Sequence, residues 1–301
     1  MTITNPRHAP VLFEEAIDFL RVRPGSTVVD CTLGLGGHAS GIARQLGAEG
    51  HLIGFEWDTN ALALAKDKLE EVSRELGSQA PRVTLIGEAF SSIAKHLQPA
   101  SVDGLIADFG VNSTHLDEAA RGFSFQADGP LDMRMDTRSG PTAAQVVNEE
   151  NEPELANLIY EYGEERRSRR LARAIVRGRP VTSTGMLARI ITSAAPTIKS
   201  EHIHPATRTF QALRIFVNRE LGEIKDLLEA APALLQPSGR LAVISFHSLE
   251  DRIAKDAFRE GARLGVWEIL TKKPVIASDE ENYRNPRSRS AKLRAAEKKT
   301  R

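Results

Sequence analysis

The sequence is poor in the residues that build disulfide frameworks and cysteine-ligated metal sites. Cys31 is the single cysteine among 301 residues. One thiol forms neither an internal disulfide nor a cysteine-based zinc site, so both are excluded. Histidine does not replace it, because His202, His204 and His247 contain no pair at i, i+4 spacing. The sequence therefore predicts no metal site.

An excess of charge of one sign is also missing. Forty Lys and Arg residues balance forty Asp and Glu residues, which excludes a globally basic nucleic-acid binder but not a local basic patch. Aromatic residues make up 5% of the chain, so extensive base stacking is not the main source of any nucleic-acid affinity. There is no run of about 18 apolar residues and no signal-peptide core. These absences predict a soluble, cytoplasmic protein.

What the chain does contain is an alternation of two hydrophobic periods. Four β-rich apolar runs are followed or separated by amphipathic helical patterns, and this order predicts an α/β fold with a mostly parallel sheet covered by helices on both faces. The expected strands are 26–30, 51–56, 83–86 and 102–109, and the expected helices are 38–46 and 60–76.

The alternation stops after Phe109 and resumes near the end of the chain. No strand pattern occurs between 117 and 205, where a helix is expected over 153–176 with a break near Gly163. One long helix is expected over 207–235, with Pro232 as the point where it could divide. Strands are expected at 239–246 and 266–270.

This order predicts a single α/β domain with an all-helical insertion. The expected parts are 1–116 for the first part of the core, 117–212 for the insertion, and 213–301 for the second part of the core. The last segment, 284–301, has eight Lys and Arg residues against one Glu. With few large apolar residues, it is expected to be an extended or mobile basic tail.

A glycine-rich loop joins the first strand to the first helix of the alternation. It runs Asp30-Cys-Thr-Leu-Gly34-Leu-Gly36-Gly37-His38. Glycines at this place allow a tight turn and a close approach of backbone to ligand, and the following helix offers unpaired N–H groups. Glu56 ends the second strand, twenty residues after Gly36, where an acid binds the hydroxyls of a ribose. The pattern predicts a site for a nucleoside cofactor.

Two cofactors fit this loop. Gly34-x-Gly36-x-x-Ala39 also satisfies the dinucleotide fingerprint, which would make the protein an NAD(P)-dependent oxidoreductase. S-adenosylmethionine has no pyrophosphate but carries a positive amine. Asp30 suits that amine and would repel a diphosphate, so the methyl donor is favoured. Taken singly, Asp30 could be a cap or turn acid, and Glu56 could be a solvated residue at the end of a strand. The placement of both acids around one loop favours the cofactor site.

The fourth strand ends in a polar segment that begins at Asp108 and continues through Asn112 and His115. In open α/β sheets ligands bind beyond the carboxyl ends of the strands, so these side chains are expected to face the reacting centre. A carboxylate at the mouth of an apolar strand is costly unless it is partnered or solvated. A loop-capping role is the alternative for Asp108.

Long motifs run in order along most of the chain. Besides the glycine loop, these motifs are His8-Ala-Pro-Val-Leu-Phe-Glu-Glu15, Arg121-Gly-Phe-Ser-Phe125, Asp128-Gly-Pro-Leu-Asp-Met-Arg-Met-Asp136, Tyr162-Gly-Glu-Glu165, His204-Pro-Ala-Thr-Arg-Thr-Phe-Gln-Ala-Leu-Arg214, Ile244-Ser-Phe-His-Ser-Leu-Glu-Asp-Arg252 and Asn285-Pro-Arg-Ser-Arg-Ser-Ala-Lys-Leu-Arg294. With these motifs the chain resembles the small-subunit ribosomal RNA methyltransferase H family, also called MraW.

The resemblance implies a Rossmann-like, class I methyltransferase core with an inserted helical domain. It also implies transfer of a methyl group from S-adenosylmethionine to the exocyclic amine, N4, of a cytidine in the decoding centre of 16S ribosomal RNA in the small subunit. The family's cofactor contacts fall on Gly36, Gly37, His38, Glu56, Phe90, Asp108 and His115. Glu56 replaces the family's usual Asp, and His115 replaces its usual Gln.

Chemistry and substrate binding complete the set of expected residues. Asp108 is the predicted acceptor for the amine proton, with Asn112 and Ser113 as the other acceptors near it. Seven arginines between 166 and 179 with no intervening acid form a candidate phosphate-binding surface, or a solvated face. The residues expected to bind RNA are Asn112, Arg134, Arg166, Arg167, Arg170 and Arg208. The other alternative is a non-catalytic RNA-binding factor in ribosome assembly.

Overall fold

The computed structural model describes residues 10–195 and 203–300. The chain divides into two compact units, a core unit made of Met1–Gly110 and Leu221–Arg301 and a helical unit made of Val111–Glu220. The borders expected after residues 116 and 212 both lie inside the helical unit. His8 and Ala9 of the first motif, His202 and Arg301 fall outside the described residues.

The core unit contains one seven-stranded sheet in the order β3-β2-β1-β4-β5-β7-β6. Neighbours among β1 to β5 pair in parallel, whereas β7 is antiparallel to both β5 and β6. This confirms the predicted α/β fold with a mostly parallel sheet. The strands are β1 Thr27–Asp30, β2 His51–Phe55, β3 Arg82–Ile86, β4 Val102–Asp108, β5 Leu235–Ser245, β6 Trp267–Ile269 and β7 Lys292–Lys298.

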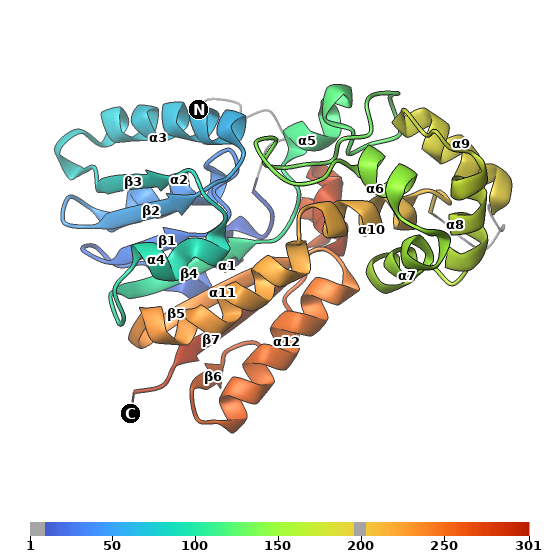
Figure 1. Cartoon of the computed structure of the whole chain (residues 1–301). Coiled ribbons are helices and arrows are strands. Elements are labelled where there is room, and N and C mark those ends of the chain that lie inside the picture. The colour runs from blue at the N-terminus through green and yellow to red at the C-terminus, as the bar shows by residue number, and fades with distance from the viewer. Residues whose placement is uncertain (1–9, 196–202, 301) are drawn as a thin grey trace. The chain divides into compact units, whose positions relative to one another are not determined.

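Helices cover both faces of this sheet (Figure 1). Alternate residues of one strand point to opposite faces: Val28 packs in the cluster with α1, α2 and α3, and Val29 in the cluster with α4, α11 and α12. The helices are α1 Phe13–Leu20, α2 Gly37–Leu46, α3 Thr59–Leu76, α4 Ile93–His96, α11 Glu220–Leu234, α12 Ser248–Arg263 and α13 Asp279–Arg284, with 3₁₀ turns at Gly77–Gln79, Phe90–Ser92 and Pro286–Ser290.

The basic C-terminal segment is not a tail. Residues 292–298 of it form β7, an inner strand between β5 and β6, with Leu293 and Ala295 fully buried. Two of its charges have a partner inside the fold, because Arg294 and Lys292 both pair with Asp251 of α12. The prediction of an extended or mobile tail was therefore wrong. A charge count cannot reveal such internal pairing.

The helical unit has its own apolar core, to which helices α6 to α10 all contribute. Its described regular elements are α5 Ser113–Asp117, a 3₁₀ turn at Ala119–Arg121, α6 Ala143–Glu149, α7 Glu152–Gly163, α8 Ser168–Arg177, α9 Thr184–Ala194 and α10 Thr207–Val217. The expected break near Gly163 is the end of α7. Among the described residues, no helix is both long enough and apolar enough to span a bilayer.

The long helix expected over 207–235 is two helices. It divides after Val217 rather than at Pro232, which lies inside α11. The division has a local cause: the side chain of Asn218 donates to the carbonyl of Arg214 at 2.9 Å, and Arg219 takes a left-handed conformation with φ 50°. A side chain that bonds its own backbone competes with helix continuation.

Candidate functional site

Three acidic residues stand at the carboxyl ends of neighbouring parallel strands. Asp30 ends β1, where it is in register with Gly54 of β2 and Ile106 of β4. Glu56 directly follows β2, and Asp108 ends β4. Because parallel strands end at the same edge of a sheet, the topology gathers the three carboxyl groups where ligands of such folds bind.

The glycine loop is held in place by Glu56. Gly34 and Gly36 have φ of 52° and 75°, values that glycine adopts at low cost. One carboxylate oxygen of Glu56 accepts the N–H of Gly34 at 2.9 Å, and the other accepts the N–H of Asp58 at 2.9 Å. Glu56 therefore braces the loop in addition to any role toward a ligand.

Thr32 is a residue of this site that the sequence analysis missed. Its backbone N–H donates to Oδ1 of Asp30 at 3.1 Å, and its hydroxyl accepts the N–H of Asp108 at 2.6 Å. One side chain thus connects the glycine loop with the end of β4. The signal in the sequence was a Thr two residues after a strand-ending Asp, the spacing of an Asx turn.

The pKa of each of the three carboxyl groups is shifted in the same direction. Burial raises the pKa of Asp30, of Glu56 and of Asp108 to about 7 in each case, and the negative charge of Asp30 adds to the shift at the other two. Among the described residues, no Lys or Arg forms an ion pair with any of the three, and Oδ2 of Asp30 is buried without a hydrogen-bond partner. Such an edge favours a cationic ligand.

The core unit also positions His38, which lies near Asp108, and Phe90, which lies near Phe109. His38, in the first turn of α2 after Gly37, is 5% exposed. Its Nδ1 lies 4.0 Å from Oδ2 of Asp108. Burial lowers the pKa of His38 to about 4, so the imidazole is neutral at pH 7. Phe90 is half-buried, with its ring 6.3 Å from that of Phe109.

Two further expected residues belong to the helical unit. His115 is 3% exposed and stacks on Phe123 with ring centroids 4.8 Å apart. Its backbone N–H donates to the carbonyl of Asn112 at 3.1 Å, so Asn112 and His115 share one turn. The side chain of Ser113 lies outside the described residues.

The arginines expected to bind RNA differ in their surroundings. Arg134 makes a two-bond ion pair with Asp132, at 2.8 and 2.9 Å, and Arg167 pairs with the buried carboxylate of Glu165 at 3.1 Å. Arg208 donates to the carbonyl of Glu164 at 3.4 Å.

Arg166 and Arg170 are exposed. Within the described part of the chain neither has an ion-pair partner. Leu171 and Ile175 are buried on the other side of α8, so Arg170 lies on the solvent face of that helix. Arg166 lies just before the helix begins.

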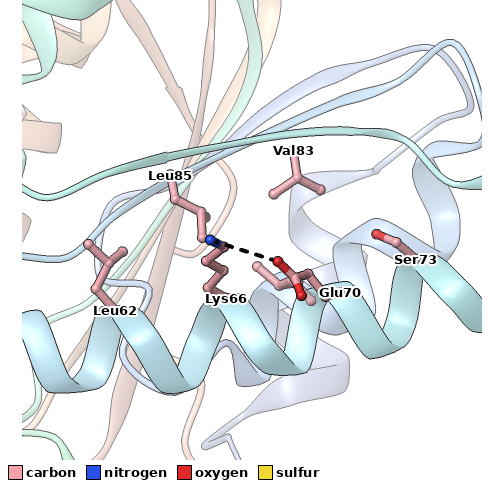
Figure 2. Close-up of a pocket in the computed structure, with 7 residues that line it drawn as sticks. Leu62, Lys66, Glu70, Ser73, Val83 and Leu85 are labelled. Atoms are coloured by element: carbon pink, nitrogen blue, oxygen red, sulfur yellow. Dashed lines mark ion pairs between the residues drawn. The ribbon is translucent and has the colours of Figure 1, made fainter.

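A separate cavity of about 430 Å³ lies between α3 and the edge strand β3. Figure 2 shows its lining, in which Lys66 and Glu70 form an ion pair at 3.9 Å. Its volume is within the range of small-molecule sites. However, none of the residues expected at the cofactor site lines it, and apart from Lys66, Glu70 and Ser73 its walls are apolar.

Comparison with known proteins decides the family. The chain matches the profile described as the MraW methylase family over residues 5–299. The chain belongs to this MraW methylase family. It is 64% identical over 293 residues to the ribosomal RNA small subunit methyltransferase H of Acidobacterium capsulatum, with 97% of this chain and 99% of that protein covered. The corresponding protein of Koribacter versatilis is 58% identical, with 97% and 94% covered.

Solved structures include a putative rRNA-methylase from Clostridium thermocellum, with a TM-score of 0.48, 14% identity, and 100% of this chain and 99% of that chain covered. Membership of a methylase family confirms S-adenosylmethionine as the cofactor of this MraW protein and overturns the oxidoreductase alternative. The acidic sheet edge fits that cofactor, because sulfonium and ammonium groups are cations whereas a dinucleotide brings a pyrophosphate.

Proposed function

We propose that this MraW family member is a cytoplasmic enzyme that methylates the exocyclic N4 amine of a cytidine in the decoding centre of 16S ribosomal RNA. The observation that carries the proposal is the group of three carboxyl groups at one sheet edge, the buried Asp30 and the half-buried Glu56 and Asp108, which form no ion pair with a Lys or Arg among the described residues. The names of the relatives support ribosomal RNA of the small subunit as the substrate.

The cofactor site of this proposal is built mainly from the core unit. Asp30, with its unpartnered Oδ2, holds the ammonium group of the methionine part. Glu56 binds the ribose while it braces the loop, and Phe90 packs against the adenine. The remaining contacts are those of the backbone and side chains of Gly34, Gly36, Gly37, His38, Asp108 and His115.

Asp108 carries the catalytic role in this proposal. When bound, S-adenosylmethionine supplies an electrophilic methyl group to the amine nitrogen. A cytosine amine is a weak nucleophile because its lone pair is delocalised into the ring, so accepting a hydrogen bond from an amine N–H helps to localise that pair. A carboxyl group whose pKa is raised to about 7 can also accept the proton that the amine loses.

Substrate binding is assigned to the helical unit. Exposed arginines such as Arg166 and Arg170 contact phosphates, whose charge supplies most of the affinity of RNA-binding surfaces. Arg134, Arg167 and Arg208 would reach RNA only by sharing their present partners Asp132, Glu165 and the carbonyl of Glu164. Asn112 is proposed to contact the target base, which must be unstacked to reach the enzyme.

One experiment tests the reaction directly. Unmethylated small ribosomal subunits and free 16S RNA are incubated separately with methyl-labelled S-adenosylmethionine and the full chain, and the RNA is digested to nucleosides for mass spectrometry. We expect label in N4-methylcytidine. Label in a different nucleoside would overturn the N4 assignment. Tight subunit binding without any label would favour the assembly factor instead.

A further inference from the structure

Residues 10–13, here called the N-terminal turn, pack directly on the first turn of α2. The ring of Pro10 lies 3.2 Å from the place that a Cβ at Gly37 would take. The ring of Phe13 stacks on His38, with centroids 5.9 Å apart and planes inclined by 27°. The Phe13 ring also fills the space of a side chain at Gly41. The N-terminal turn therefore packs against the end of the glycine loop, at Gly37 and His38.

Two hydrogen bonds connect this turn to distant parts of the core unit. The carbonyl of Val11 lies 3.1 Å from Nε2 of His38. The N–H of Leu12 donates to Oε1 of Glu281, 269 residues further along the chain, at 2.8 Å. Leu12 is fully buried and has φ 51°. A buried N–H needs a partner, and a left-handed non-glycine residue persists where its surroundings hold it. Glu281 supplies that partner.

The bond to Val11 determines which nitrogen of His38 carries the hydrogen. A carbonyl oxygen only accepts hydrogen bonds, so Nε2 is the donor and Nδ1 of the neutral ring carries a lone pair. That lone pair belongs to the nitrogen that lies 4.0 Å from Oδ2 of Asp108. The position of the Val11 carbonyl thus decides whether His38 directs a lone pair or an N–H toward Asp108.

We propose that Glu281 is a positioning residue for the cofactor site. By holding the N–H of Leu12, it fixes the N-terminal turn, and the turn fixes the orientation and tautomer of His38 through Val11. The affinity for S-adenosylmethionine then depends on a side chain of α13 that does not touch the cofactor. The inference rests on the proposed role of His38 at the cofactor site.

The test compares three variants of the full chain by calorimetric titration with S-adenosylmethionine. Glu281→Ala removes the acceptor and is expected to raise the dissociation constant about tenfold, the scale of one buried hydrogen bond. Glu281→Gln keeps an acceptor oxygen and is expected to stay within about twofold of the parent. Glu280→Ala is the matched control, because Glu280 is an exposed neighbour that pairs with Arg284 and should have no effect.

A second readout separates positioning from stability. In protein with ¹⁵N-labelled histidine, NMR should show His38 as the Nε2–H tautomer in the parent and in Glu281→Gln, and as a mixture in Glu281→Ala. A lower melting temperature with unchanged affinity and unchanged His38 signals would overturn the proposal. If Glu281→Ala does not fold, Glu281→Asp, which withdraws the carboxylate by one methylene, must weaken binding at least about twofold, or the proposal fails.

The variant His38→Ala distinguishes this inference from the proposed cofactor site. Unchanged affinity in His38→Ala would remove His38 from the cofactor site and the inference with it. Weakened affinity in His38→Ala together with unchanged affinity in Glu281→Ala would overturn the role of Glu281 alone.

Discussion

The hydroxyl of Thr32 accepts a hydrogen bond from the backbone N–H of Asp108 at 2.6 Å. Because the N–H of Thr32 also donates to Asp30, Thr32 connects the two carboxyl-bearing residues and fixes their relative positions. We expect Thr32→Val, which keeps the shape, to lower kcat about tenfold, the scale of one lost buried hydrogen bond. Thr32→Ser should restore most of it. Equal losses in both variants, measured by steady-state kinetics, would point to packing instead.

Asp108 is expected to be more important for turnover than for folding. Asp108→Ala should lower the rate of methyl transfer at saturating cofactor by at least about a hundredfold, the scale of a positioned acid–base group. The rate is measured with labelled donor on small subunits, and a parallel titration gives the cofactor affinity. Near-normal turnover at saturation would remove Asp108 from the catalytic role and leave it a binding residue.

Cofactor affinity should rise with pH. Protonated carboxyl groups cannot attract a cation, and the pKa values of Asp30, Glu56 and Asp108 are raised to about 7. Between about pH 6 and pH 8 binding must therefore displace protons, and we expect the dissociation constant to fall over this range by about tenfold in total for each carboxyl group that must lose its proton. Calorimetric titration across this range measures the effect, and a flat profile would contradict it.

The variant Asp30→Asn tests the raised pKa of Asp30 in a second way, through the stability of the fold. In the folded protein Asp30 holds its proton up to about pH 7, whereas the unfolded chain loses it near the ordinary value of 3.8. The free energy of unfolding therefore falls as the pH rises from the unfolded pKa of 3.8 to the folded pKa of about 7. Asn keeps an oxygen for the N–H of Thr32 without the charge. Asp30→Asn should melt at a higher temperature than the parent at pH 8 without cofactor, yet bind cofactor more weakly.

The exposed arginines Arg166 and Arg170, just before and within α8, should account for part of the salt dependence of RNA binding. Replacing Arg166 and Arg170 with Ala should reduce the slope of log K against log salt by about 0.7 to 0.9 for each lost phosphate contact. The control replaces Arg259 and Arg263 of α12, which changes the net charge equally. Arg167 is left in place because its loss would strand the buried Glu165. An unchanged slope would mean that the arginine surface is only solvated.

Asn218 is expected to be essential for the loop that carries Arg134. Its side chain accepts the N–H of Met135 at 2.7 Å and donates to the carbonyl of Met133 at 2.8 Å, and Met133 is fully buried with φ 62°. Asn218→Ala would leave buried backbone groups unpaired and should cost about 2–4 kcal/mol of unfolding free energy. Urea denaturation measures this, and a loss below about 0.5 kcal/mol would contradict the role.

The pattern of strands was predictable because local periodicity reports it directly. Val28 and Val29 alternate between two buried faces, and the parallel order follows from helices that alternate with strands. The carboxyl-end positions of Asp30, Glu56 and Asp108 follow from the same pattern, since each acid closes an apolar run. Local sequence also indicated the glycine loop, where Gly34 and Gly36 adopt positive φ.

Other features depend on contacts between residues far apart in the chain. The basic run at the C-terminus contributes an inner strand, in which Arg294 pairs with Asp251 of α12, and the buried loop at Met133 depends on a hydrogen bond from the distant side chain of Asn218.

Acid types and spacing along the strands were thus sufficient to indicate a cationic nucleoside site. The raised pKa values, the link through Thr32 and the bond from Leu12 to Glu281 required the folded chain. Burial and hydrogen bonding depend on which distant groups meet, and no local pattern contains that information.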